Sequence, residues 1–120
     1  MNTRCLDEHS HLGVEKTMEI LGDKWTVALI HHLVQGKNRF GLLRRAMKGI
    51  SPKTLALRLR SLEAHRIIRR KIFPEVPLHI EYRLTKKGKS LGRVLRVMED
   101  WGSDLEEIPS PDPLDEPRID

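Results

Sequence analysis

The sequence predicts a mainly α-helical domain that carries one small β-hairpin. Apolar residues recur at three- and four-residue steps along most of the chain, which is typical of helices that bury one face. Glycines and capping residues separate these segments. Between residues 67 and 84 the apolar spacing changes to alternation around two prolines, which indicates two short strands and a turn. This order of elements is that of a helix-turn-helix followed by a hairpin, or wing.

Length and charge limit the possible functions. The 120 residues suggest a single domain with a modest core, and the formal net charge is +5. Residues 37–71 contain twelve Lys or Arg and a single acid, a local balance of +11, whereas residues 105–120 have a balance of −5. A basic body of this kind favours a polyanionic partner.

The single cysteine, Cys5, excludes an internal disulfide and fits a reducing compartment. The first twenty residues contain no apolar run of signal-peptide length, and no stretch approaches the roughly 18 apolar residues of a membrane span. We therefore expect a soluble cytoplasmic protein without a membrane partner. No residue pattern predicts a cofactor.

Four helices are expected before the hairpin, and each has a start or stop signal. Asp23 and Asn38 are predicted caps for the second and third helices, and Gly22 is the predicted end of the first. Residues 1–12 are polar and without period, so they are predicted to form a flexible arm. The predicted helices cover residues 14–21, 24–34, 39–47 and 52–65.

The fourth helix carries the main functional prediction. Ser51 and Pro52 form a strong helix start, because Ser caps free amides and Pro is favoured at the first helical position. At about 100° per residue, Leu55, Leu59 and Leu62 form one apolar ridge that should face the core. The opposite face then presents the following residues: Lys53, Leu57 and Arg60. A leucine among cations suits a surface that meets thymine methyls and phosphates together.

A hairpin and a long helix complete the domain. The strands are predicted at 67–73 and 80–84, and Thr85 should cap the last helix. Its apolar stripe needs a cover, for which a partner subunit is the simplest choice and the first helix of the same chain the alternative. The stripe comprises Leu91, Val94, Leu95, Met98, Trp101 and Leu105. We assign residues 13–107 to the domain and 108–120 to a disordered acidic tail.

Several blocks of the sequence resemble the HxlR-type winged helix-turn-helix regulators of the MarR-like group. They are GDKWTVALIHHL (22–33), RFGLLRRAMKGISPKTLALRLRSLE (39–63), FPEVPLHIEYRLTKKG (73–88) and WG (101–102). The resemblance covers residues 14–102, and its blocks occur in the family's order and spacing. It implies a prokaryotic transcriptional regulator that binds double-stranded DNA as a homodimer.

The resemblance also implies roles for particular residues. The helix after GIS would enter the major groove, where Lys53 and Arg60 can reach guanine and Thr54, Ala56 and Leu57 can contact thymine methyls. Arg39 would hold phosphate, and Lys71 and His79 would flank the wing tip. The DNA-binding set is Arg39, Ser51, Lys53, Thr54, Ala56, Leu57, Arg60, Lys71 and His79.

The terminal helices build the dimer in this family. That implies an interface from Val14, Met18, Leu91, Val94, Leu95, Met98 and Trp101. A two-fold dimer would read an inverted repeat with half-site centres about 10 bp apart. One departure concerns the family's Cys-Pro pair before the first helix, whose positions hold Leu12 and Gly13 here. Redox sensing is therefore not implied.

Three other readings remain as alternatives. Cys5, His9 and His11 could make the protein a redox- or metal-responsive variant, but their spacing matches no zinc pattern, so no metal site is predicted. A less specific nucleic-acid module is the second alternative. Catalysis is the third; it is not expected, because the adjacent His31 and His32 do not face each other on a helix. The sequence identifies no pocket for a small-molecule effector.

Overall fold

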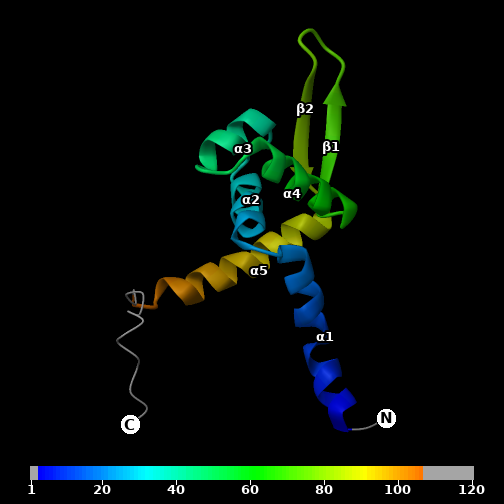
Figure 1. The fold of residues 1–120 in the computed structure, drawn as a ribbon, viewed down its shortest axis with the longest axis vertical. Helices are drawn as coiled ribbons and strands as arrows, with labels where there is room; N and C mark the ends of the chain where they lie inside the picture. Colours follow the sequence, from blue (N-terminus) through cyan, green and yellow to red (C-terminus); the bar gives the residue numbers. More distant parts are fainter. Residues whose placement is uncertain (1–2, 107–120) are drawn as a thin grey trace.

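The computed structural model describes residues 3–106, with side chains from Leu12 onward. The elements are α1 (Thr3–Leu21), α2 (Lys24–Val34), α3 (Phe40–Ala46), α4 (Pro52–Ala64), β1 (Ile68–Phe73), β2 (His79–Leu84) and α5 (Lys86–Ser103). Figure 1 shows α3, α4 and the hairpin in its upper half, with α1 and the far end of α5 extending below them. The predicted winged helix-turn-helix fold is confirmed.

Local capping explains where three of the helices start. The Asp23 carboxylate accepts the Thr26 backbone N–H at 3.1 Å, and the Ser51 hydroxyl accepts that of Thr54 at 3.0 Å. Each bond satisfies an amide that has no partner within its own helix. Thr85 caps α5 in the same way through the amide of Gly88. These three caps were predicted from the sequence.

Two predicted boundaries were wrong. Helix α1 begins at Thr3, so residues 3–12 continue the helix where an arm was expected. That segment lacks an apolar period, yet it has no Gly or Pro before Gly13 to interrupt a helix. The N-cap of α3 is Arg39, which makes no side-chain capping bond, whereas Asn38 was predicted. The Asn38 carbonyl instead accepts the Tyr82 N–H at 2.8 Å, which ties this segment to the wing.

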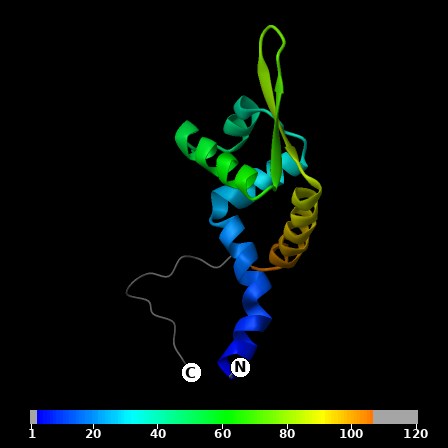
Figure 2. The same cartoon turned by 90° about the vertical axis from the view of Figure 1, so that its right-hand side faces the viewer.

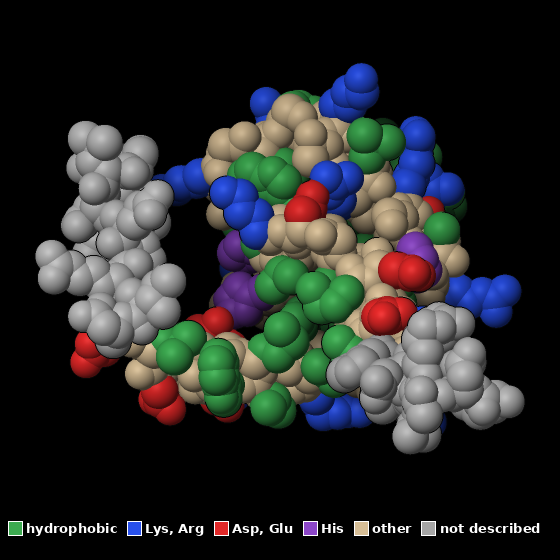
Figure 3. Space-filling model, turned by 60° about the horizontal axis from the view of Figure 1, so that its bottom comes forward, with side chains coloured by type: hydrophobic (Ala, Val, Ile, Leu, Met, Phe, Trp, Pro, Cys, Tyr) green, Lys and Arg blue, Asp and Glu red, His purple; other side chains and the backbone are tan. Residues whose placement is uncertain are grey.

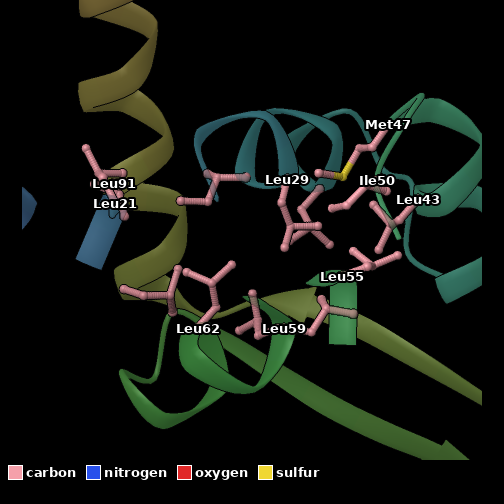
Figure 4. Packing of buried hydrophobic residues seen from close by; sticks show 13 residues of the cluster. Leu21, Leu29, Leu43, Met47, Ile50, Leu55, Leu59, Leu62 and Leu91 are labelled. Carbon is pink, nitrogen blue, oxygen red and sulfur yellow. The ribbon is translucent and has the colours of Figure 1, made fainter. Parts of the chain in front are cut away.

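The core lies between α2, α3 and α4. The leucine ridge of α4 is buried as predicted and belongs to one cluster with Leu29 and Ile30 of α2. Figure 4 shows Leu55 and Leu59 on the side of α4 that faces Leu29. Burying each such side chain contributes on the order of 1.5–3 kcal/mol. Leu57, on the same helix, remains 46% exposed. The orientation of α4 is therefore set by its apolar ridge, which leaves the basic face outside.

The hairpin projects from this core, as Figure 2 shows from the side. Its strands are antiparallel, with Ile68 opposite Leu84 and Ile72 opposite Ile80. Helix α5 is packed hard against the base of the hairpin. A Cβ at Gly88 would lie 2.1 Å from the Ile67 carbonyl oxygen, so only glycine fits there. This contact fixes the start of α5 relative to the wing.

Candidate nucleic-acid interface

The exposed face of α4 brings three of the predicted DNA-binding residues together. Lys53, Leu57 and Arg60 are all exposed and recur at three- and four-residue steps, so they form one stripe. Ser51 and Thr54 stand at the start of the helix, where their hydroxyls bond each other at 2.9 Å. The stripe can therefore present two cations and an apolar side chain to a groove.

Ala56 and Arg58 lie on the flanks of this stripe and are partly buried. The Arg58 guanidinium donates to the carboxylate of Asp23, the cap of α2. This charge is thus already paired within the protein. Its position predicts that Arg58 holds α4 against α2, whereas Lys53 and Arg60 remain available for a partner.

The supporting helix α3 adds cations that the sequence prediction left out. Arg44 and Arg45 are exposed in its last turn, and Lys48 follows in the link to α4. Gly49 in that link has φ +89°, a conformation that side chains other than glycine rarely adopt. The run of cations was visible in the sequence, but the short helix did not show which of them face outward.

The base of the hairpin forms a second basic surface. Arg69 and Arg83 stand directly opposite each other on the two strands. Like charges in this position destabilise a sheet. Arg83 is paired with Glu81 at 2.8 Å, so Arg69 is the one of the two without an ion-pair partner between residues 12 and 106. A hollow of about 500 Å³ lies here beside the start of α5, and five cations line it: Arg69, Arg70, Lys71, Arg83 and Lys86.

At the wing tip, carboxylates lie close to the predicted DNA-binding residue His79. His79 stacks on Phe73 with ring centroids 4.6 Å apart, and its ring nitrogens lie 3.4 Å from Glu81 and 4.0 Å from Glu75. The Arg83 guanidinium lowers the pKa of Glu81 and keeps that carboxyl ionised. Lys71 is exposed, with its ammonium 4.9 Å from the Phe73 ring. Of the two predicted tip residues, His79 thus has two carboxylates beside it, whereas Lys71 is exposed.

A separate apolar surface lies on α1 and α5. The predicted dimer residues Val14, Met18, Val94, Met98 and Trp101 are exposed, and Trp101 is 70% exposed. Leu105, which the predicted stripe includes, is exposed as well, and Leu12 and Val97 extend the same surface although they had not been assigned to it. Figure 3 shows hydrophobic side chains gathered across the lower middle of this face. Exposed apolar clusters of this size are uncommon on monomeric proteins, where they often mark interaction sites.

Leu91 and Leu95 have a different place from the one predicted. Leu91 is buried in the core of its own chain, and Leu95 packs against that core. They face inward because α5 lies across α2, which covers this side of the helix. Leu91, predicted for the interface, is thus already covered by its own subunit.

The alternative metal, redox and catalytic sites gain no support from the described part of the chain. The side chains of Cys5, His9 and His11 lie outside it, and residues 12–106 contain no cluster of three or more potential metal ligands. The His31 and His32 rings meet edge to face, with centroids 5.4 Å apart. The predicted tail, residues 108–120, also lies outside the described residues. Among the described helices, none has the length and apolar character that crossing a membrane requires.

Comparison with known proteins identifies the family. The uncharacterized HTH-type transcriptional regulator sll1512 of Synechocystis sp. is 39% identical over 100 residues, which span 83% of this chain and 74% of that protein. The corresponding regulator YdeP of Bacillus subtilis is 40% identical over 96 residues, covering 80% and 75%. The solved structure of the redox regulator HypR in its oxidized form superposes with a TM-score of 0.73 at 36% identity, covering 80% of this chain and 99% of that one. The sequence profile of HxlR-like helix-turn-helix proteins matches residues 20–108, and the chain belongs to this family.

Proposed function

We propose that the protein is a transcriptional regulator that binds double-stranded DNA as a homodimer. The observation that carries the proposal is the orientation of α4, which buries its leucine ridge and exposes Lys53, Leu57 and Arg60. A helix of this shape fits the major groove, where base edges can be read. Its relatives are named as transcriptional regulators, which favours a regulatory role and not a catalytic one.

The cations divide into two groups under this proposal. Lys53 and Arg60 read base edges, chiefly guanine O6 and N7, with a discrimination of about 1–3 kcal/mol for each good contact. Arg39, Arg44 and Arg69 neutralise phosphates and supply affinity without sequence preference. Both groups surround α4 and the hairpin, so one duplex can engage them together.

The homodimer rests on the apolar surface of α1 and α5. An isolated domain would leave Trp101, Met98 and Val97 in water, and a second copy would cover them. The two recognition helices would then be related by a two-fold axis. We propose an inverted-repeat operator with half-site centres about 10 bp apart, and a cytoplasmic location in a prokaryotic cell, where DNA is accessible.

Selection of bound sequences from a random duplex pool, at a stated salt concentration, tests this function. The parent should enrich an inverted repeat, and Arg60→Ala should relax preference at one position in each half-site. Lys16→Ala, which removes an exposed cation from α1, is the matched control and should leave the enriched motif unchanged. A pool that shows no enrichment with the parent, although the protein is folded and dimeric, contradicts sequence-specific binding.

A redox-responsive regulator is a second candidate, favoured by the likeness to the redox regulator HypR. Cys5 is the single thiol available. DNA affinity measured before and after diamide treatment, with Cys5→Ser beside the parent, separates the two cases. A change in the parent that Cys5→Ser abolishes supports redox control, and equal affinities exclude it.

A further inference from the structure

A cavity away from the basic face of α4 has no role in the function proposed above. It lies between the C-terminal end of α2, strand β2 and one flank of α5, and its volume is about 610 Å³. This is within the range of small-molecule sites in proteins. Because three elements distant in the sequence form it, no single sequence segment predicts it.

The walls of the cavity are largely apolar. Leu33 and Val34 come from the end of α2, and Leu84 comes from the end of β2. On the α5 side, a Cβ at Gly92 would lie only 2.9 Å from Cγ2 of Val34. The two helices therefore close the cavity where they approach each other. A flat or branched apolar group would lose its contact with water on entering.

The rim of the cavity is cationic, and its lining contains no acidic residue. Arg83 is bonded to Glu81 at 2.8 Å, and Arg96 lies 3.8 Å from Asp100. Lys89 and Arg93 form no ion pair with any residue between 12 and 106. Within residues 12–106, two cations therefore stand over an apolar wall without an ion-pair partner, and charge complementarity calls for an anionic group attached to an apolar body.

The cavity is separate from the proposed dimer surface. At about 100° per residue, the cavity flank of α5 carries Lys89, Gly92 and Arg93. The apolar flank, with Val94, Met98 and Trp101, lies on the other side of the buried stripe at Leu91. A partner that packs on Val94, Met98 and Trp101 therefore leaves Lys89 and Gly92 uncovered, and Arg93 stands at the edge of that surface, one turn from Val97.

We propose that this cavity binds a small organic monocarboxylate with an aromatic or branched apolar body. The carboxylate pairs with Lys89 and Arg93, and the apolar body lies against Leu33, Val34 and Leu84. The bound molecule touches the base of the wing and α5 together. It also lies beside the bond from the Tyr82 N–H to the Asn38 carbonyl, which joins the wing to the α2–α3 link.

The test uses 2-naphthoate as the probe, with neutral 2-naphthamide and inorganic sulfate as comparisons, and no DNA. Titration of the full-length protein by calorimetry should show saturable binding of 2-naphthoate, and binding of 2-naphthamide at least about tenfold weaker. Amide signals of residues 33–36 and 82–84 should shift in the ¹H–¹⁵N spectrum. Because no DNA is present, the result is independent of the function proposed above.

Variants distinguish binding of 2-naphthoate in the cavity from a general attraction of the basic protein for anions. Lys89→Gln combined with Arg93→Gln should weaken 2-naphthoate binding about tenfold, and Val34→Phe should block it by filling the cavity. Lys87→Gln, on the same helix but outside the lining, should bind like the parent. Equal binding of naphthoate and naphthamide, a sulfate affinity equal to that of naphthoate, shifts centred on Trp101, or an equal loss in Lys87→Gln would each overturn the proposal.

Discussion

Arg58 of α4 donates a hydrogen bond to the carboxylate of Asp23, the residue that caps α2. One side chain thus serves two elements, since Asp23 also accepts the backbone N–H of Thr26 at 3.1 Å. The contact joins the first helix of the core to the helix whose exposed face we propose as the DNA reader. Its loss should affect both the stability of α2 and the position of α4.

Replacing Asp23 tests that joint role. Asp23→Ala removes the cap and leaves Arg58 without its partner, so the free energy of unfolding should fall by about 1–2 kcal/mol. Asp23→Asn keeps a capping oxygen and should cost less. Asp100→Ala, at an exposed carboxylate 3.8 Å from Arg96, is the control and should change stability by less than about 0.5 kcal/mol. Urea denaturation measures all three, and equal losses in Asp23→Ala and Asp100→Ala would contradict the role.

The same contact should make stability depend on acidity. The hydrogen bond from Arg58 lowers the pKa of Asp23 in the folded protein. The unfolded state then binds the proton first as the pH falls, so this contribution is complete above the usual carboxyl pKa of about 4 and disappears below it. Exposure of both side chains keeps the effect small. Urea midpoints between pH 5 and pH 2.5 should fall less steeply in Asp23→Asn than in the parent. Parallel curves for the two proteins would show that Asp23 does not contribute to the pH dependence of stability.

The burial of His32 should make stability depend on pH in a second, higher range. Its Nδ1 is buried without a hydrogen-bond partner among the described residues, and burial, with Lys37 and His31 nearby, lowers the pKa of the ring. The unfolded state therefore binds the proton more readily. Stability should be complete above the usual histidine pKa of about 6.5 and should decline as the pH falls below it. His32→Gln should flatten melting temperatures measured from pH 7.5 to 5.5, and His65→Gln, at an exposed histidine, should not. A parent curve that is already flat would rule this out.

The leucine ridge of α4 shows what the sequence alone could predict. Capping by Ser51 and the spacing of Leu55, Leu59 and Leu62 are local properties, and the structure places all of them as expected. The exposed face of α4 follows directly, because a helix with one apolar ridge has only one way to face its core. The central part of the candidate site was therefore predictable.

The rest depended on contacts between distant segments. Asn38 is not the cap because α3 starts one residue later, at Phe40, and the Asn38 carbonyl is bonded to Tyr82 on the wing. Leu91 fits the apolar stripe of α5 as well as Met98 does, and only the crossing of α5 over α2 decides which is buried. The cavity between α2, β2 and α5 arises in the same way. Periodicity states which side of a helix is apolar but does not state which element covers it.

Replacing Arg69 should have opposite effects on the stability of the protein and on its binding to DNA, because Arg69 lies opposite Arg83. They face each other across the hairpin, so Arg69→Thr removes a like-charge pair and should leave the unfolding free energy unchanged or raise it by about 0.2–1 kcal/mol. The same change should weaken DNA binding uniformly across sequences and reduce the log–log salt slope by about 1. Arg70→Thr is the control. Arg70 already has Glu63 as an ion-pair partner at 3.7 Å, so its removal should change the salt slope less than Arg69→Thr does. Binding isotherms at several salt concentrations provide the measurement. If the salt slope of Arg69→Thr equals that of the parent, Arg69 does not contact a phosphate.

Met98 should separate folding from dimerisation. Its side chain is half exposed on the apolar flank of α5, so Met98→Glu adds a charge that an isolated subunit tolerates but a packed apolar interface does not. We expect sedimentation equilibrium to show a folded monomer, with a parent-like far-UV spectrum and about tenfold or greater loss of affinity for an inverted repeat. Lys89→Glu, on the opposite flank of the same helix, should remain dimeric. If Met98→Glu sediments as a dimer, the apolar flank of α5 does not form the interface, and the two recognition helices must be brought together by another surface.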